Sequence, residues 1–407
     1  MNDALSPAPT ASEPPLLGLR VLELASILAG PVTAQFLAEL GAEVIKVENP
    51  ATGGDPTRSW RLAGEDRAGT VSAYFSCANW GKRSIAVDVT KNPGRELIHR
   101  LAGVSDVVIA SYKPGDDARL GLDPATLLAR NPRLIYAQIS AYGSADPRPG
   151  FDAIIQAESG FTYLNGEPGG PPVKMPVALV DLLAAHQLKE AILLAMLQRE
   201  RSGRGRHVHV ALLDAAVASL ANQASNFLVA GVIPERMGSE HPNIVPYGAI
   251  YRLGDGRELV LAVGTERQWR ALTEALGQRE LAEDLRFADN QARVVHRVAL
   301  HARLTEAFAT RNSDEVRARL QAAGVPFGFV NDMQQVFAQP GGRRALMENG
   351  TLSGVRTFVA EGLGSRRNLS PPPGYDADGA AILDELGYDA ARRQALIDAG
   401  AWPGGDR

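Results

Sequence analysis

The sequence predicts an α/β protein with a helix-covered parallel sheet in a larger domain, accompanied by a smaller α+β domain. Short apolar runs alternate with segments of helical periodicity from Gly18 onward, a pattern typical of buried parallel strands joined by helices. The 407 residues contain 45% hydrophobic side chains, enough for a sizeable core and for two or three domains. A hairpin pattern followed by helices, from residue 249 on, indicates the smaller α+β unit.

The first elements form a strand–helix–strand unit. A strand is expected over 19–24, a helix over 31–40 that begins at Gly30-Pro31, and a second strand over 42–47 before Glu48. This unit imitates a dinucleotide-binding motif. The turn after the first strand reads ASILAGP, however, and lacks the fingerprint G-x-G-x-x-G. We therefore expect a Rossmann-like sheet that does not bind NAD.

The later elements extend this series. Strands are expected over 84–88, 107–110, 134–139 and 206–211, and helices over 94–101, 124–130, 182–201 and 212–229. Polar residues interrupt the helix over 182–201, so we expect a core helix and not a membrane span. A hairpin over 249–263 turns at Gly254-Asp255-Gly256, helices follow to about 323, and a strand is expected over 324–330. The tail is Pro-rich from 370 and then helical through 396.

Composition limits the partners that the protein can have. The net charge of −4 and the lack of a basic run argue against nucleic acid as a partner. The single cysteine, Cys77, excludes an intramolecular disulfide framework and fits a cytoplasmic location. We expect it to be a packed residue, with a reactive thiol as the alternative. His207 and His209 share one strand face without a third ligand nearby, so we expect no metal site.

The run from 151 to 215 contains the residue of greatest chemical interest. Asp181 lies between a Gly/Pro-rich loop and the long apolar helix. An aspartate in this place is commonly an N-cap, held by free backbone N–H groups and by the positive end of the helix dipole. Such surroundings would keep the carboxylate ionised and fixed in direction. Spacing alone favours a cap, and a nucleophile is the alternative.

Several motifs, taken in order, resemble those of the class III coenzyme A transferases. They are GLRVLELASILAGP, NWGKRSIAVDV, SDVVIASYKPGDDARLGL, GFDAIIQAESG and RSGRGRHVHVALLDA. The resemblance covers nearly the whole chain. MGSEHPNIVPYGAIY and GVPFGFVNDMQQVFAQP are most similar to the succinyl-CoA:glutarate type of this family (CaiB/BaiF type).

The resemblance implies a mechanism and an assembly. Asp181 would be the covalent nucleophile, passing through a mixed anhydride and an aspartyl-CoA thioester. Coenzyme A thioester is then a substrate, and neither a metal nor a permanently bound cofactor is needed. Family members are interlocked homodimers with a discontinuous large domain. The expected segments are a disordered tail over 1–16, the large domain over 17–225, the small domain over 226–328, and a return segment over 329–407.

The resemblance also implies a coenzyme A site. Its phosphates need fixed cations, and Arg119 matches a CoA-binding arginine of the family. The other matching positions are Val87, Asp88, Thr90, Ser111, Tyr112 and Lys113. Each of the basic residues could equally be a solvated surface group.

The acyl site departs from the formyl-CoA transferase pattern. Leu28 replaces a glutamine of that subfamily, so formate and oxalate are poor candidates and dicarboxylic acids such as succinate and glutarate are favoured. Arg148, Arg236 and His241 are candidates for binding a distal carboxylate, and Asp152 and Gly238 are further substrate-binding candidates. Candidate oxyanion donors lie in 166–170 and 237–239, although the glycines there could serve only as turns. PPPGYDADG replaces the family's C-terminal motif, and its role stays open.

Two alternative activities remain. A 2-methylacyl-CoA racemase shares the fold and the aspartate, but it needs a histidine where this chain has Phe151. Glu266 does match the glutamate of the racemases. An acyl-CoA hydrolase would share the aspartyl intermediate and would release free coenzyme A without an acceptor acid.

Overall fold

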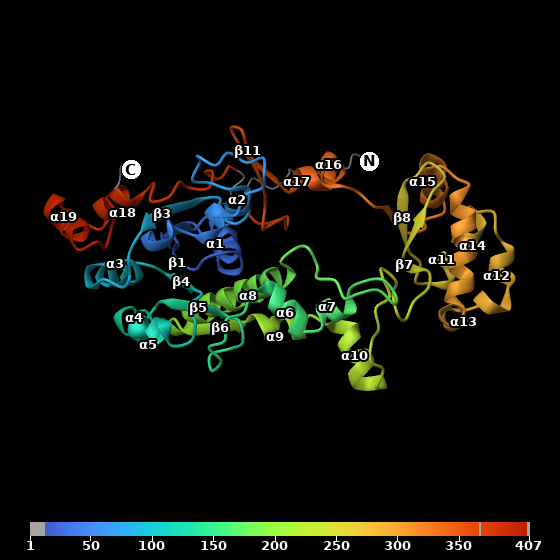
Figure 1. Cartoon of the computed structure of the whole chain (residues 1–407), viewed down its shortest axis with the longest axis horizontal. Coiled ribbons are helices and arrows are strands. Elements are labelled where there is room, and N and C mark those ends of the chain that lie inside the picture. The colour runs from blue at the N-terminus through green and yellow to red at the C-terminus, as the bar shows by residue number, and fades with distance from the viewer. Residues whose placement is uncertain (1–12, 366–367, 405–407) are drawn as a thin grey trace, which may run out of the picture. The chain divides into compact units, whose positions relative to one another are not determined.

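The computed structural model describes residues 13–365 and 368–404 (Figure 1). Most of the expected disordered tail, residues 1–12, lies outside the described residues. The chain divides into two compact units, and each is described by itself. The larger unit comprises 1–159, 176–221 and 343–407, and the smaller unit comprises 160–175 and 222–342.

The larger unit is built on a six-stranded sheet in the order β3-β2-β1-β4-β5-β6. Its strands are β1 (Arg20–Leu24), β2 (Glu43–Glu48), β3 (Lys82–Ala86), β4 (Val107–Ala110), β5 (Ile135–Ser140) and β6 (His207–Ala211). Every neighbouring pair is parallel. This is the strand order of a Rossmann-like sheet, which confirms the expected fold class.

Helices cover both faces of this sheet. On one face α1 (Ala29–Glu39) packs against β1, β2 and β4, and α8 (Leu179–Ser202) packs against β5 and β6. On the other face α3 (Asn92–Gly103) and α5 (Pro124–Arg130) share a core with the C-terminal helices α18 (Gly379–Glu385) and α19 (Ala390–Asp398). The remaining helices of this unit are α2 (Ala73–Ser76), α4 (Asp116–Leu120), α6 (Asp152–Glu158) and α9 (Leu212–Ala218), with the 3-10 turns η1 (Pro50–Thr52) and η2 (Pro56–Ser59).

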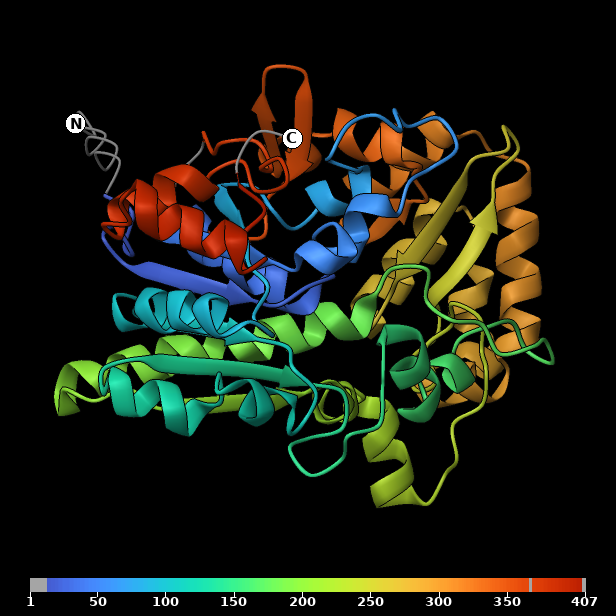
Figure 2. The ribbon, with the colours of Figure 1, turned by 60° about the vertical axis from the view of Figure 1, so that its left-hand side comes forward.

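The C-terminal segment closes the free edge of β3. The backbone N–H groups of Ser84 and Ala86 donate to the carboxylates of Asp378 and Asp376, both at 2.9 Å or less. The Trp402 indole N–H also donates to Asp376, at 3.0 Å. Figures 1 and 2 show α18, near the red end of the colour scale, beside β3. An uncovered edge strand exposes unpaired backbone groups, so the PPPGYDADG segment has a definite structural role.

The larger unit also contains a hairpin that the sequence analysis does not predict. β10 (Leu346–Asn349) and β11 (Leu352–Val355) are antiparallel, and this orange-red hairpin is clear in Figure 2. Its turn lies at Gly350, whose φ is +61°. Such a short ribbon gives only a weak alternating pattern.

The smaller unit has a three-stranded antiparallel sheet. β7 (Tyr247–Arg252) and β8 (Glu258–Ala262) form the expected hairpin around residues 254–256, and β9 (Phe327–Phe329) pairs with β8. Its helices are α7 (Phe161–Leu164), α10 (Ala221–Ala230), α11 (Glu266–Ala275), α12 (Glu280–Glu283), α13 (Asn290–Val295), α14 (Arg297–Ala309), α15 (Ser313–Ala322), α16 (Met333–Ala338) and α17 (Pro340–Arg344), with the 3-10 turn η3 (Leu285–Phe287). Trp269, Tyr251, Phe287 and Phe308 are buried together in its core.

No described helix has the length and apolarity that a membrane span would require.

One predicted helix is wrong. The segment 212–229 is not continuous, because α9 ends at Ala218 and α10 begins at Ala221, whose φ of +46° breaks the helical path. The boundary between the two units falls here as well. Periodicity continues across this break, so the sequence pattern does not reveal it.

Candidate active site

Asp181 lies in the first turn of α8 and is not its cap. The helix begins at Leu179, two residues before Asp181, and its N-cap is Ala178. The free backbone N–H group of Val180 donates instead to Oδ1 of Asp152, at 2.8 Å. The cap that spacing alone favours at Asp181 is therefore absent, because Asp152 from α6 accepts the hydrogen bond at the helix start.

The electrostatic state of Asp181 also differs from the expectation. The residue is only 8% exposed, and its carboxylate has no hydrogen bond within the described part of the chain. Burial, and then the charge of Asp152, raise its pKa to about 7. The expectation of a firmly ionised group is wrong, because burial and the neighbouring Asp152 charge both disfavour the charged form. The carboxylate is therefore more basic than an ordinary aspartate, and no described group donates a hydrogen bond to it.

A cavity of about 280 Å³, which we name the Asp181 pocket, surrounds this carboxylate. It is lined by Asp181, Leu212 and residues 26–30, 111–114, 139–141 and 148–151. Leu28, Ser111, Tyr112, Lys113 and Arg148 therefore lie in one pocket with Asp181. Phe151 also lines it, at the position where a racemase needs a histidine.

A second cavity of about 310 Å³, the Asp88 pocket, adjoins the first. It is lined by Val87, Asp88 and Thr90 together with parts of 46–56, and it shares Ser26, Ser111 and Tyr112 with the Asp181 pocket. Both pockets lie at the carboxyl ends of β1 and β4, where the strand order reverses. This switch point is where open α/β sheets bind ligands. The arrangement offers one connected site with two compartments.

The two basic candidates on this side of the unit have different surroundings. Arg148 stacks on Tyr142 at 4.0 Å and pairs with Asp146 at 2.8 Å at the rim of the Asp181 pocket. Arg119 lies on α4, its side chain is 74% exposed, and it pairs with Asp116 at 3.0 Å. Arg119 lines neither pocket.

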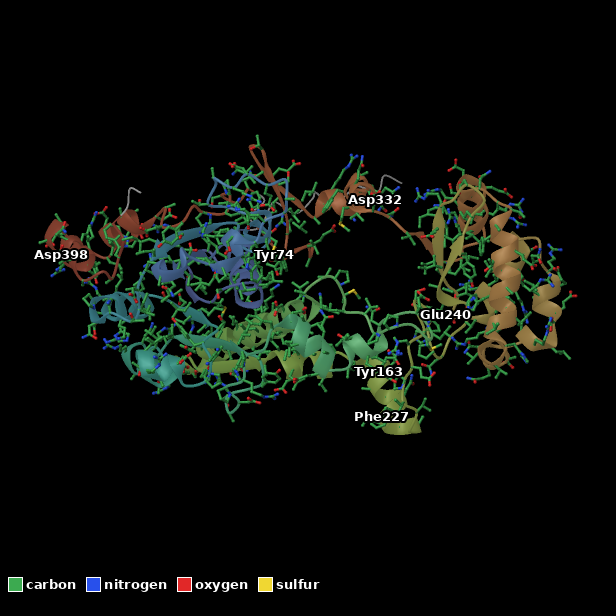
Figure 3. The ribbon with its side chains drawn as sticks, viewed as in Figure 1. Tyr74, Tyr163, Phe227, Glu240, Asp332 and Asp398 are labelled. Carbon is green, nitrogen blue, oxygen red and sulfur yellow. The ribbon has the colours of Figure 1, made fainter. Side chains whose placement is uncertain are left out.

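The other candidates belong to the smaller unit. Gly238 donates its N–H to the carbonyl of Gly166 at 2.9 Å, so the two glycine-containing segments meet and this donor is already engaged. Arg236 donates to the carbonyls of Tyr163 and Gly170, each at 3.0 Å. His241 packs on Tyr247 at 5.3 Å, and its neighbour Glu240 pairs with Arg297 at 2.9 Å. Tyr163 and Glu240 are labelled in Figure 3.

Glu266 is held in an ion pair. Both of its oxygens accept hydrogen bonds from Arg293, at 2.7 and 2.9 Å. The hydrogen bonds from Arg293 lower the pKa of Glu266 against the effect of burial. A carboxylate paired in this way is a poor proton acceptor.

The cysteine and the two strand histidines show no sign of reactivity. Cys77 is exposed as a residue, but its thiol is desolvated enough to raise its pKa to about 11, so the thiol is not activated. His207 hydrogen-bonds with Gln138 at 3.0 Å, and His209 with Ser140 at 2.9 Å.

The sequence analysis missed a group of buried charges beside the site: Glu23, Lys46, Asp55 and Lys82. Glu23, Lys46 and Lys82 lie inside strands of the parallel sheet and are buried there. Charged residues are unusual at such positions, and this was the available signal.

Comparison with known proteins places the chain in a family. CoA-transferase family III matches residues 16–369. The chain is 40% identical to the succinate–glutarate CoA-transferase of Agrobacterium fabrum, over 92% of this chain and 96% of that one. It is 34% identical to the succinyl-CoA:glutarate CoA-transferase of Homo sapiens, over 95% and 89% of the two chains.

Solved structures agree with this placement. A CaiB/BaiF family protein from Brucella suis superposes with a TM-score of 0.80 at 41% identity, covering 92% of this chain and 100% of that one. A protein from Mycobacterium tuberculosis, Rv3272, gives a TM-score of 0.80 at 35% identity, covering 91% and 99%. The chain therefore belongs to CoA-transferase family III, and it is a CoA-transferase.

Proposed function

We propose that this protein transfers coenzyme A between dicarboxylic acids, with succinyl-CoA as the donor and a glutarate-like acid as the acceptor. The observation that carries the proposal is the buried Asp181 carboxylate, without a hydrogen bond in the described chain, inside a pocket at the switch point of the sheet. Two relatives with at least 34% identity are named for succinate or succinyl-CoA and glutarate. A third, also 34% identical, is named succinyl-CoA–D-citramalate CoA-transferase.

Asp181 acts as the nucleophile in four steps. Its carboxylate attacks the carbonyl carbon of the donor thioester, the C–S bond breaks, and coenzyme A leaves as a thiolate, so that a mixed anhydride of Asp181 and the donor acid remains. The thiolate then attacks the Asp181 acyl carbon, which releases the donor acid and forms an aspartyl-CoA thioester. The acceptor carboxylate attacks this thioester and forms a second anhydride. Coenzyme A finally attacks the acceptor acyl carbon, and Asp181 is regenerated.

The two compartments divide the substrate between them. The Asp88 pocket receives the coenzyme A portion, and the Asp181 pocket receives the thioester and the acyl chain. Leu28, Ala29 and Gly30 line the Asp181 pocket at the start of α1, where helix N–H groups point outward. These backbone donors face the developing oxyanion and are favoured by the helix dipole.

Two cations at the rim favour a diacid as substrate. Lys113 and Arg148 both line the Asp181 pocket. A carboxylate at the far end of the acyl chain can form charge-assisted hydrogen bonds there. A monocarboxylic acyl chain leaves this binding energy unused, so we expect butyryl-CoA to be a poorer donor than succinyl-CoA.

The racemase alternative lacks the histidine of its proton-carrying pair, because Phe151 stands at that position. Phe151 cannot carry a proton, and Glu266 is tied to Arg293 with a lowered pKa. An acyl-CoA hydrolase differs from a transferase in one measurable property. The hydrolase consumes the thioester without an acceptor acid, whereas the transferase consumes it only when an acceptor acid is present.

The test is the exchange of coenzyme A from succinyl-CoA to a panel of acids, with Asp181→Asn as the variant. We expect Asp181→Asn to abolish transfer, because the amide cannot form the anhydride. Glu190→Gln, an exposed position of the same helix, is the matched control and is expected to retain activity. Mass spectrometry of the wild type during turnover should show an adduct on Asp181. Transfer by Asp181→Asn, or hydrolysis without an acceptor acid, would overturn the proposal.

A further inference from the structure

Four buried charged side chains form a cluster that takes no part in the proposed bond-making steps, although Lys46 and Asp55 also line the Asp88 pocket. Lys46 Nζ lies 2.7 Å from Glu23 and 2.8 Å from Asp55, and Lys82 Nζ lies 2.6 Å from Glu23. Each of the four side chains is at most 1% exposed. Two positive and two negative charges balance one another. We name this group the buried charge cluster.

Three further hydrogen bonds of the cluster go to one stretch of backbone, the β1–α1 segment of residues 25–31, while others involve Thr57 and Asn79. The Ile27 N–H donates to the Asp55 carboxylate at 3.2 Å. Lys46 donates to the carbonyl of Ala25 at 3.0 Å, and Lys82 donates to the carbonyl of Pro31 at 2.9 Å. The cluster thus holds this segment at its start, its middle and its end.

The middle of the segment is strained. Ile27 has a φ of +73°, in the left-handed region that a β-branched residue avoids. Such a conformation persists only where the surroundings enforce it, and it is often found at functional sites. Burial would raise the pKa of Asp55, but the charge of Lys46 and the hydrogen bonds from Lys46 and Thr57 together outweigh this effect and lower the pKa. The hydrogen-bond acceptor that holds Ile27 therefore stays charged.

The strained segment forms a wall of the site. Residues 26–30 line the Asp181 pocket, and Ser26 lines the Asp88 pocket as well. A change of φ at Ile27 would turn the following peptide groups, including the N–H groups at residues 28–30. A displacement of about 1 Å in a reacting assembly can slow a reaction by about 100-fold.

We propose that Asp55 is a positioning residue of the transferase. Together with Lys46 and Lys82, it holds the β1–α1 segment in the strained shape that aligns an acyl-CoA with Asp181. The inference rests on the proposed function of Asp181. A purely structural role for the cluster would change the stability of the fold, but not the acylation rate of each folded molecule.

The experiment compares three variants by the single-turnover rate of Asp181 acylation with succinyl-CoA. Asp55→Asn keeps the shape of the side chain but removes its charge, and we expect acylation to slow by about 10- to 100-fold. Ile27→Gly relieves the strain, because glycine adopts a positive φ freely. In the double variant we therefore expect at least a threefold recovery relative to Asp55→Asn, and such non-additivity indicates coupling.

Glu43→Gln is the matched control. Glu43 pairs with Arg20 and Arg83 at the opposite end of β1 and β2, and the acylation rate of this variant should match that of the wild type. Thr57→Val provides a milder second variant, since the Thr57 hydroxyl donates to Asp55 at 2.8 Å. It remains informative if Asp55→Asn does not fold, and we expect about threefold slower acylation.

The outcomes separate this inference from the proposed function. Wild-type acylation in folded Asp55→Asn or Thr57→Val would overturn the positioning role, as would strictly additive effects in the double variant. If Asp181→Asn still forms product, the proposed function fails. An inactive Asp181→Asn combined with an unaffected Asp55→Asn refutes only the positioning role.

Discussion

The carboxylates of Asp152 and Asp181 both lie at the first turn of α8, but only that of Asp152 accepts hydrogen bonds from described groups. Asp152 accepts from Val180 at 2.8 Å and from Gln156 at 2.7 Å, whereas no described group donates to Asp181. The N–H group of Val180 at the helix start is therefore satisfied without Asp181, the proposed nucleophile. A carboxylate that is already desolvated and unbonded loses little when it attacks an acyl carbon.

The rate of acylation should follow the ionisation of Asp181. With a pKa of about 7, the reactive carboxylate becomes about tenfold scarcer for each pH unit below neutrality. Asp152→Asn keeps an oxygen for Val180 but removes the charge that helps to raise this pKa. We therefore expect the rising limb of the pH–rate profile to move to lower pH by less than about one unit. A limb that stays in place, or that moves upward, would contradict this assignment.

The same ionisation should appear in stability. The pKa of Asp181 is raised from 3.8 in the unfolded reference to about 7 in the folded chain, so the folded state binds more protons between these values. The free energy of unfolding therefore falls as pH rises from about 4 to 7, by up to about 4 kcal/mol. Asp181→Asn should be more stable than the wild type at pH 8 and similar to it at pH 4, as measured by urea denaturation. Equal stabilities at both pH values would show that the carboxylate is not desolvated.

At the residue scale, Asp181, Leu28 and the positions 87–90 and 111–113 could be selected as candidates from the sequence. Each lies in a motif whose type and order match those of the family. It could not identify the hydrogen-bond partner of Val180. Asp152 and Asp181 are 29 positions apart, and either residue type can cap a helix. The strained backbone at Ile27 could not be predicted from the sequence either, since isoleucine rarely adopts a positive φ.

At the element scale, the predicted helices and strands are accurate where the hydrophobic periodicity is strong. The strand Val107–Ala110 and the helix Pro124–Arg130 agree with the structure to the residue, and the other strands of the six-stranded sheet differ by only one or two positions. The helix predicted over 212–229 failed because backbone torsion at one residue interrupts an unbroken apolar pattern. The start of α8 was placed too late, since the polar Asp181 was interpreted as its boundary.

The attachment of the C-terminal segment to β3 can be tested at Asp376. Asp376→Ala leaves the Ala86 and Trp402 N–H groups without their acceptor, and we expect a loss of about 2–3 kcal/mol in the free energy of unfolding. Asp398→Ala is the control (Figure 3), because this exposed carboxylate accepts only from Gln394 in the described chain. Its expected effect is below about 0.5 kcal/mol. Equal losses in both variants would remove the special role of Asp376.

At the scale of the whole molecule, apolar surface on the larger unit favours assembly. Leu193, Leu194 and Leu197 on α8 are 40%, 61% and 52% exposed in the single chain, and such a cluster is typical of a protein interface. We propose a homodimer and expect light scattering to give twice the chain mass of 43.3 kDa. Leu194→Lys should reduce the dimer fraction or the yield of folded protein. A single-chain mass at micromolar concentration would contradict the proposal.

The cover of the β3 edge has a consequence for synthesis in the cell. Asp376, Asp378 and Trp402 are translated about 300 residues after the strand that they protect. Chains emerge from the ribosome N-terminal end first, so the open edge of β3 and the apolar face beneath α18 and α19 stay uncovered until residues 376–402 have been synthesised. Nascent chains of this enzyme should therefore need chaperone shielding for most of their elongation, and premature stop codons should yield insoluble fragments.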